Sequence, residues 1–279
     1  HFMIIQHNIA AINSYRNLGV NQSALNKNLE KLSSGYRINR AGDDAAGLAI
    51  SETMRSQING LNQSVINAND AIGLIQTAEG ALTETHSMLQ RLTTLATQSA
   101  NGTYNSTARQ NIQIEVNRLL EEIDRIANYT DFNGIKPLQN ATSQGAVQMT
   151  FQIGPSAQET IKVNTSDMTT TSLGLSSGTT VNLTTLNTSN TAITTIKNAI
   201  NMVSKYRAQL GAAQNRLEHT VNNLKVTSEN ITAAESRIRD TDMADEITAF
   251  TKNNILLQAS QSMLAQSNSV PQSVLSLLG

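Results

Sequence analysis

Apolar residues recur every seven positions through long stretches of both halves of this chain. In the C-terminal third the repeat consists of Ile196, Val203, Leu210, Leu217, Leu224, Ile231 and Ile238. In the N-terminal half it consists of Leu61, Ala68, Ile75, Leu82, Leu89 and Ala96. Such a repeat is typical of helices that pack side by side in coiled-coil-like bundles. We therefore predict a mainly α fold, an elongated rod of long antiparallel helices with a small β-hairpin region.

The composition agrees with helix-on-helix packing and excludes several function classes. Only 3% of the residues are aromatic and Trp is absent, which favours thin seams of aliphatic side chains over a bulky globular core. The net charge of -1 argues against a nucleic-acid partner. The absence of Cys excludes disulfides and thiolate chemistry. Because no run of 18 apolar residues occurs, we expect no membrane-spanning helix.

Motifs that would indicate an enzyme are absent from the sequence. None of the four histidines shares a metal-ligand spacing with another, and there is no HExxH motif. The stretch "AGDDAAG" lacks the lysine and the preceding strand of a phosphate-binding loop. Ser and His residues are scattered without a nucleophile elbow. We therefore expect no metal, no cofactor and no catalytic site.

The middle of the chain changes in character. After a break at residues 99–106, residues 107–128 predict a shorter helix with an apolar face of Ile112, Val116, Leu119, Ile123 and Ile126. Alternation through residues 146–154 and 159–165 predicts a β-hairpin. Residues 164–195 are rich in Thr, Ser and Asn, and we expect an exposed loop with a short strand near Val181 and Leu183. A surface for O-linked sugars is the alternative interpretation of that segment.

Each end of the chain carries a short seven-residue repeat and a charged joint. The repeats are Ile4, Ala11, Leu18, Leu25 and Leu32, and Met243, Phe250, Leu257 and Leu264. In "KLSSGYRINRAGDDAAGLAI", residues 31–50, Gly35 suits the left-handed position that closes a helix, and Asp43 and Asp44 suit the start of the next helix. Residues 235–246, "ESRIRDTDMADE", have the same mixture of arginines and aspartates. Because neither terminal seam can be covered alone, we expect these helices to need each other and other chains.

Several of these stretches together resemble the bacterial flagellins. The motifs are "LEKLSSGYRINRAGDDAAGLAIS", "LIQTAEGALTETHSMLQRL", "EIDRIANYTDFNG", "LGAAQNRLEHTVNNL", "SRIRDTD" and "VPQSVLSLL", in that order. The likeness covers roughly residues 3–138 and 190–279. It implies a secreted, extracellular subunit of the helical flagellar filament that polymerises with itself. It also implies export by the flagellar type III machinery, with an export chaperone and the filament cap and hook-junction proteins as partners. A hook–filament junction protein, which has similar ends, is the alternative.

The resemblance also implies a division of the chain. Residues 3–42 with 240–279 correspond to an inner-tube domain with a spoke joint, and residues 43–239 to an outer-tube domain that includes the 140–190 hairpin and polar surface segment. Large outer domains are lacking. We expect residues 3 to about 40 and 240–279 to be mobile in the monomer and helical in the filament. The joint residues implied are Arg37, Arg40, Asp43, Asp44, Arg237, Arg239 and Asp240. The inner-tube packing residues implied are Leu18, Leu25, Leu32, Phe250, Leu257, Leu264 and Leu277.

A last implication concerns host recognition. In the family, the end of the first long helix and the middle of the next bind the flagellin-sensing Toll-like receptor. The matching residues here are Gln90, Arg91, Leu95, Gln98 and Glu115. An arginine, an apolar anchor and a carboxylate suit an interface. The alternative is that Arg91 and Glu115 simply pair between neighbouring helices or subunits, and both interpretations can hold together.

Overall fold

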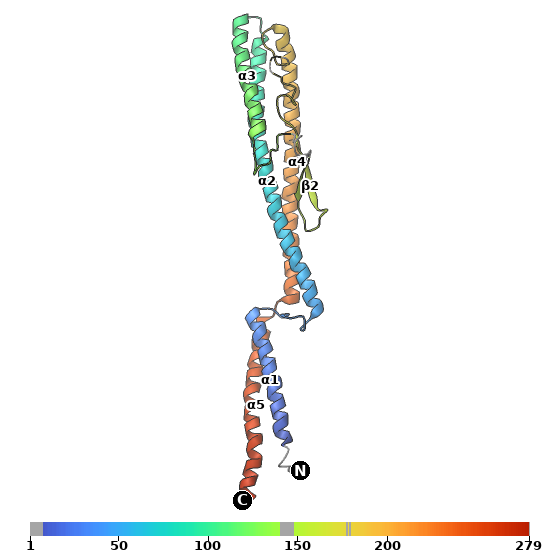
Figure 1. Ribbon diagram of the computed structural model, residues 1–279, viewed down its shortest axis with the longest axis vertical. Helices are drawn as coiled ribbons and strands as arrows, with labels where there is room; N and C mark the ends of the chain where they lie inside the picture. Colours follow the sequence, from blue (N-terminus) through green and yellow to red (C-terminus); the bar gives the residue numbers. More distant parts are fainter. Residues whose placement is uncertain (1–7, 140–147, 177, 179, 279) are drawn as a thin grey trace. The chain divides into compact units, whose positions relative to one another are not determined.

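The computed structural model describes residues 8–139, 148–176, 178 and 180–278, and the side chains up to residue 273. The described residues form five α-helices and one two-stranded sheet, which confirms the predicted mainly α fold with a small hairpin (Figure 1). The elements in chain order are α1 (Ile9–Ser34), α2 (Ala45–Ser99), α3 (Ser106–Tyr129), β1 (Gln148–Gln152), β2 (Thr160–Asn164), α4 (Leu186–Arg239) and α5 (Met243–Leu278). None of the described helices is long and apolar enough to cross a membrane.

The chain divides into two compact units. The first, here called the terminal unit, contains the residues up to Ile58 together with those from Glu229 onward. The second, here called the bundle unit, is Asn59–Ser228. Both α2 and α4 contribute residues to each unit.

In the bundle unit, α2, α3 and α4 lie side by side, with α2 antiparallel to the other two. Ser228 Oγ donates to Asn62 Oδ1 at 3.2 Å, and Ser189 Oγ donates to Ser99 Oγ at 3.2 Å, so α4 runs opposite to α2. The arginine–carboxylate pair of Arg91 and Glu115 joins α2 to α3. All six residues of the predicted α2 stripe are buried, and so are the first five of the α4 stripe, Ile196 to Leu224. The seven-residue repeats therefore identify the core of the bundle.

The helix α3 begins and packs largely as predicted. The Asn105 side chain precedes it and accepts from the backbone N–H of Ala108 at 2.8 Å, which satisfies a free donor of the first turn. Its buried face is Ile112, Val116, Leu120, Ile123 and Ala127. Leu119 and Ile126, which the sequence placed in that face, are only half-buried at its edge. The face is wider than one seam and shifted by a residue because α3 packs against a core of several elements rather than one helix.

The predicted β-hairpin is confirmed. β1 and β2 pair in antiparallel fashion, with Met149 opposite Val163 and Phe151 opposite Ile161. These four apolar side chains share one face of the sheet, and all four pack in or against the core of the bundle unit. Val147, which the alternation also included, lies outside the described residues.

The prediction that residues 164–195 form an exposed loop is wrong for most of that segment. α4 begins at Leu186, and the described residues before it form no regular strand at Val181 and Leu183. Apolar side chains along the segment are buried in the core: Met168, Leu173, Leu175, Val181 and Leu183. The polar backbone is satisfied by α3, where Gln113 accepts from the Leu183 N–H at 2.7 Å and Asp124 accepts from the Thr170 N–H at 2.7 Å. The high Ser and Thr content therefore conceals a segment whose apolar side chains are buried and whose backbone is hydrogen-bonded to α3.

Candidate functional site

The helices α1 and α5 form an antiparallel pair in the terminal unit. Asn21 Nδ2 donates to Ser260 Oγ at 2.8 Å, and Lys31 Nζ lies 3.6 Å from the Glu246 carboxylate. At the far end of the pair, Asn8 Nδ2 donates to the Ser267 carbonyl oxygen at 2.8 Å. Because residue numbers rise along α1 as they fall along α5, the two helices run in opposite directions.

The seam between α1 and α5 alternates apolar and polar residues. On α1 the seam residues are Ala11, Ser14, Leu18, Asn21, Leu25, Asn28 and Leu32. On α5 they are Glu246, Phe250, Asn253, Leu257, Ser260, Leu264 and Ser267. Among the described residues of α1 only Asn28 is buried, and the others in the seam are half-buried. Polar side chains in a seam specify register at a cost in stability, so this pair is a weak one.

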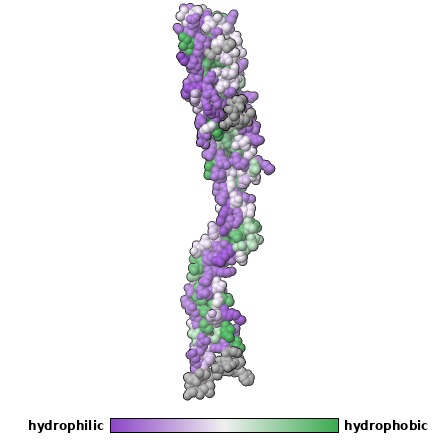
Figure 2. Space-filling view, viewed as in Figure 1, coloured by the Kyte–Doolittle hydropathy of each residue, from purple (hydrophilic) through white to green (hydrophobic). Residues whose placement is uncertain are grey.

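Large aliphatic side chains face away from that seam. On α1, Ile9, Ile12, Val20 and Leu29 are exposed, Ile12 by 62%. On α5 the exposed ones include Ile247, Ile255 and Met263, the last by 63%. Figure 2 shows the hydrophobic residues, in green, spread over the visible surface of the terminal unit. An apolar surface of this kind on a helix pair marks an interaction site.

The predicted packing residues with described side chains lie in the α1–α5 seam, and a second set of apolar residues, which the sequence analysis did not identify, faces outward. Leu18, Leu25, Leu32, Phe250, Leu257 and Leu264 all lie in the α1–α5 seam. The side chain of Leu277 lies outside the described residues. The outward set does not follow the seven-residue spacing of the seam. The signal that could have found it is the presence of Ile and Met at positions between the seam residues.

The joint, residues 35–44 and 237–242, connects these helices to α2 and α4. Gly35 ends α1 in the left-handed conformation, with φ 73°, and its N–H donates to the Lys31 carbonyl at 2.8 Å. Asp44 immediately precedes α2 and accepts from the Gly47 N–H at 2.9 Å. The backbone N–H of Arg40 donates to Asp43 and holds the pKa of that carboxyl below its usual range. The two helix-end roles expected for Gly35 and Asp44 are thus present.

The two segments of the joint, residues 35–44 and 237–242, are paired through backbone hydrogen bonds. The Arg37 N–H donates to the Arg239 carbonyl at 2.7 Å, and the Thr241 N–H donates to the Gly35 carbonyl at 3.0 Å. Tyr36 and Asp240 lie opposite each other in this antiparallel bridge. The Arg37 guanidinium adds a bond to the Ile238 carbonyl. Two segments about 200 residues apart in sequence are therefore held as one unit.

Side chains around this bridge form a charged network that the sequence only partly indicated. Arg55 lies 3.0 Å from Glu235, and Arg239 pairs with Glu52. Both guanidiniums lie over the Tyr36 ring, at 5.8 Å for Arg55 and 4.9 Å for Arg239.

The predicted joint residues do not all join the bridge. Arg40 pairs instead with Glu30 at 2.9 Å and Asp43 with Lys27 at 3.8 Å, both on α1, while Arg237 is exposed. Sequence reasoning missed Tyr36, Glu52, Arg55 and Glu235. These residues contact partners far away in the sequence, so their contacts can be identified only when the two segments of the joint are paired.

The predicted receptor-binding residues lie on α2 and α3 of the bundle unit. Arg91 and Glu115 form an ion pair at 2.8 Å, and both side chains are about half exposed. Gln98 donates to the Tyr104 hydroxyl at 2.8 Å, and Gln90 contacts the His86 ring at 3.1 Å. These four polar residues present atoms to solvent.

Leu95 cannot act as the exposed apolar anchor that was expected. Its side chain is 2% exposed and packs in the core of the bundle unit. The reason is that α2 is covered by both α3 and α4, so its buried face includes Leu92 and Leu95 beside the single stripe at Leu89 and Ala96.

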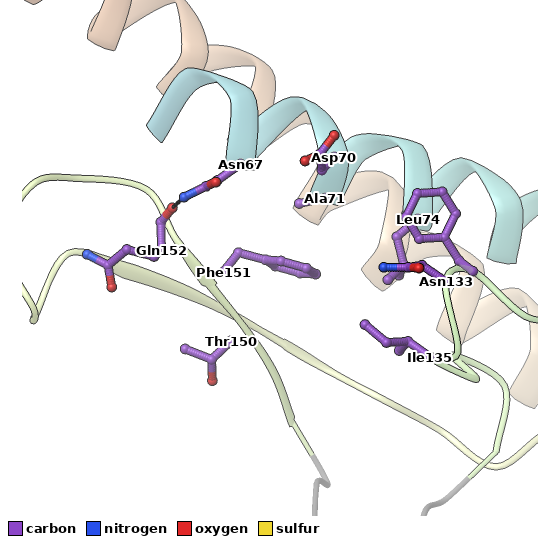
Figure 3. Close-up of a pocket in the computed structure, with 10 residues that line it drawn as sticks. Asn67, Asp70, Ala71, Leu74, Asn133, Ile135, Thr150, Phe151 and Gln152 are labelled. Carbon is purple, nitrogen blue, oxygen red and sulfur yellow. Dashed lines mark hydrogen bonds between the residues drawn. The ribbon is translucent and has the colours of Figure 1, made fainter. Parts of the chain in front are cut away.

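One hollow on the bundle unit has a mixed apolar and polar lining. Its volume is about 530 Å³, and Asn67 at its edge donates to the Gln152 carbonyl at 3.1 Å (Figure 3). Of the described residues that line it, Asp70 alone has a titratable side chain. Nowhere in the described part of the chain do three His, Cys, Asp or Glu residues gather as metal ligands would. The remaining lining residues are Ala71, Leu74, Phe132, Asn133, Ile135, Thr150 and Phe151.

Comparison with known proteins gives a consistent result for the whole chain. The bacterial flagellin N-terminal helical region matches residues 5–143, and the bacterial flagellin C-terminal helical region matches residues 193–278. The flagellin of Bacillus subtilis (strain 168) is 53% identical over 303 residues, covering 99% of this chain and 100% of that protein. A flagellar filament 33 kDa core protein of Treponema phagedenis is 48% identical over 285 residues, with the same coverage.

A solved structure agrees. The crystal structure of Bacillus cereus flagellin superposes with a TM-score of 0.51 at 35% identity, covering 61% of this chain and 94% of that one. The match includes both halves of the chain and the helices that carry the apolar seams. The chain therefore belongs to the bacterial flagellin family, whose members are structural subunits of the flagellar filament rather than enzymes.

Proposed function

We propose that α1 and α5 build the inner layer of the filament by binding neighbouring copies of this chain through their outward aliphatic residues. Residues 3–42 and 240–279 then form the inner tube and residues 43–239 the outer tube. The observation that carries this proposal is the exposure of Ile12, Ile255 and Met263 in a pair whose seam is half polar. Burying each such side chain contributes about 1.5–3 kcal/mol, so a second copy is the occupant that stabilises the pair most directly.

The joint is proposed to act as the spoke between the two layers. Its predicted residues are Arg37, Arg40, Asp43, Asp44, Arg237, Arg239 and Asp240. The backbone hydrogen bond between Arg37 and Arg239 supports this role, because it fixes the path of both chain segments of the joint. A backbone hydrogen bond does so without using apolar side chains. Charged side chains that remain at its surface, such as Arg237, are free to contact neighbouring subunits.

The assembly proposal is tested by substituting the outward face of α5. Ile255→Asn is expected to abolish elongation of short filament seeds, scored by sedimentation and negative-stain microscopy. Ile114→Asn is the matched control, because both isoleucines are 61% exposed and Ile114 lies in the bundle unit. Equal elongation by the wild-type chain and the Ile255→Asn variant would overturn the proposal. A chain that caps seeds instead of extending them would point to a junction protein.

Export and partner binding belong to the same proposal. The chain is proposed to leave the cell through the flagellar type III machinery, with a chaperone covering the apolar face of α5 before secretion, and to meet the cap and hook-junction proteins at the ends of the filament. The exposed aliphatic residues of α5 support a chaperone contact. Co-elution of the chain with a flagellin export chaperone, lost when residues 243–279 are removed, is the expected result. Retention of the complex by the truncated chain would place the chaperone site elsewhere.

The free monomer is also proposed to bind the host flagellin-sensing Toll-like receptor through Gln90, Arg91, Gln98 and Glu115. The exposed polar atoms of these residues along α2 and α3 support this assignment. With Leu95 in the core, affinity at this patch must come from hydrogen bonds and charge, as a polar interface permits.

A further inference from the structure

We propose that Asn101, in the turn between α2 and α3, is a site of spontaneous deamidation. The turn then acquires a carboxylate with time, without any enzyme. Asparagine followed by glycine is the pair most open to this reaction, because glycine has no side chain to hinder its own amide nitrogen. The chain contains three such pairs: Asn59-Gly60, Asn101-Gly102 and Asn133-Gly134.

The reaction needs a free backbone N–H. The amide nitrogen of the glycine loses its proton and attacks Cγ of the asparagine side chain, forming a C–N bond while the side-chain nitrogen leaves as ammonia. Water then opens the five-membered imide at either carbonyl and gives an aspartyl or an isoaspartyl residue. A hydrogen bond that holds the glycine N–H opposes the first step, since the proton is retained and the backbone is fixed.

Two of the three pairs are held in that way. Asn59 and Gly60 both lie inside α2, where helical hydrogen bonds engage the backbone N–H groups. The N–H of Gly134 donates to the Asp131 carboxylate at 3.0 Å. A carboxylate acceptor makes this bond a strong one and also disfavours loss of the amide proton.

In the third pair, Asn101-Gly102, the reacting atom is the Gly102 amide nitrogen. Across the described residues, the Gly102 N–H has no acceptor, and a side chain added at Gly102 would meet nothing within 4 Å. The oxygen of the same peptide group is engaged, because the Asn101 carbonyl accepts from Arg109 Nη2 at 3.1 Å and from the Tyr104 N–H at 3.3 Å. In a trans peptide the N–H points opposite to the C=O, so the Gly102 N–H faces solvent.

The Arg109 contact favours the reaction further. A guanidinium that donates to a peptide oxygen draws electron density from that peptide group, which makes its N–H more acidic. The Asn101 side chain is meanwhile held within the turn, since its Oδ1 accepts from the Thr103 N–H at 3.3 Å. The amide carbon under attack is thus kept beside its own backbone rather than directed into solvent.

Deamidation of Asn101 changes the turn that joins α2 to α3. An aspartyl residue adds a negative charge beside Arg109 and keeps the acceptor for Thr103. An isoaspartyl residue adds one carbon to the backbone and disrupts the bonds from Arg109 and Tyr104 to residue 101. The Tyr104 hydroxyl also accepts a hydrogen bond from Gln98, so disruption of the turn reaches one of the proposed receptor-binding residues. This consequence for receptor binding rests on the proposed function, whereas the deamidation itself does not.

The test is a time course of the purified full-length chain at mildly alkaline pH, in buffer and in denaturant. Peptide mass spectrometry measures the mass gain of deamidation at each of the three pairs, and isoaspartate is confirmed enzymatically. In denaturant all three are expected to react at comparable rates. In buffer Asn101 is expected to keep a rate close to its denatured one. Asn59 and Asn133 are expected to slow by at least about tenfold, the factor that corresponds to breaking one hydrogen bond of about 1.4 kcal/mol.

Two variants sharpen the result. Asp131→Ala removes the acceptor of the Gly134 N–H, so Asn133 is expected to react faster in the folded chain. Asn101→Gln is expected to remove the signal from the turn and leave the other pairs unchanged. Protection of Asn101 in buffer equal to that of Asn133 would overturn the proposal, whatever the effect on receptor binding or assembly.

Discussion

The guanidinium of Arg239 lies 4.9 Å from the centre of the Tyr36 ring and also bonds to the Glu52 carboxylate. The last residue of α4 is thus held against the connection from α1 to α2. Its side chain is only 12% exposed, whereas Arg216, on the same helix but outside the joint, is exposed. The two arginines therefore allow a joint residue to be compared with a surface residue of the same charge.

Arg239→Ala is expected to weaken filament formation. The loss of the ring contact and the carboxylate bond costs about 1–2 kcal/mol, which raises the critical concentration for filament growth by a factor of about 5–30. Arg216→Ala, at an exposed position of α4 within the bundle unit, is the control and is expected to change it by less than a factor of about three. Sedimentation of filaments at a series of subunit concentrations measures both. Equal effects of the two substitutions would show that the charge alone matters and the Tyr36 contact does not.

Alkaline pH is expected to destabilise the bundle unit through Tyr206. Burial raises the pKa of Tyr206 to about 12, above the ordinary tyrosine value of about 10, and its hydroxyl donates to the Pro137 carbonyl at 3.1 Å. The unfolded chain therefore loses this proton first as the pH rises. Stability that is fully present below pH 10 is lost between about pH 10 and 12, by up to about 3 kcal/mol.

Tyr206→Phe checks this pH dependence. Phenylalanine cannot ionise, so the variant should lose less stability between about pH 10 and 12, although at neutral pH it is less stable by about 1 kcal/mol because the Pro137 carbonyl loses its donor. Urea unfolding at each pH measures the difference. Tyr129→Phe, at an exposed ring, serves as the control. Parallel pH profiles for Tyr206→Phe and the wild-type chain would contradict the assignment to Tyr206.

The sequence predicted best those features that depend on local periodicity. The α2 and α4 stripes, the α3 start and the hairpin alternation were all evident, because a repeating apolar pattern fixes which face of an element is buried. Gly35 and Asp44 were recognised from helix-end chemistry alone.

Features that depend on long-range pairing were missed. The burial of Leu175 and Leu183 requires α3 side chains such as Gln113 and Asp124 to satisfy the intervening backbone. Leu95 was misplaced because a single stripe cannot show that a helix is covered on two sides. The Arg55–Glu235 pair joins residues 180 positions apart, and no local pattern links them.

The half-polar seam of α1 and α5 is expected to keep this pair loose in the monomer. Asn28 is 9% exposed, and its Nδ2 has no hydrogen-bond partner among the described residues. A buried donor left unpaired costs about 1–3 kcal/mol. Asn28→Leu is therefore expected to stabilise the pair and to slow the protease trimming that we predict at both ends of the monomer.

Timed proteolysis of the monomer measures this effect, with Ser23→Leu at an exposed position of α1 as the control. Trimming that proceeds at the same rate in Asn28→Leu and in the wild-type chain would show that the seam does not limit the stability of the ends. Ends of the wild-type monomer that resist protease as well as residues 60–130 would contradict the predicted looseness altogether.

Arg91→Ala is expected to weaken binding of the monomer to the flagellin-sensing Toll-like receptor by at least about tenfold, or 1.4 kcal/mol. Arg91 Nε donates to Glu115 at 2.8 Å, and the pair is about half exposed, so its contribution to folding is at most about 1 kcal/mol. A larger loss in binding than in stability therefore reports contacts with the receptor. Arg118→Ala, which breaks an exposed pair with Glu121 on the same helix, is the control for a general loss of charge. Surface binding measurements with soluble receptor, alongside urea unfolding of each variant, separate the two effects. Unchanged binding in both Arg91→Ala and Glu115→Ala would show that the ion pair only joins α2 to α3 and that the receptor site lies elsewhere.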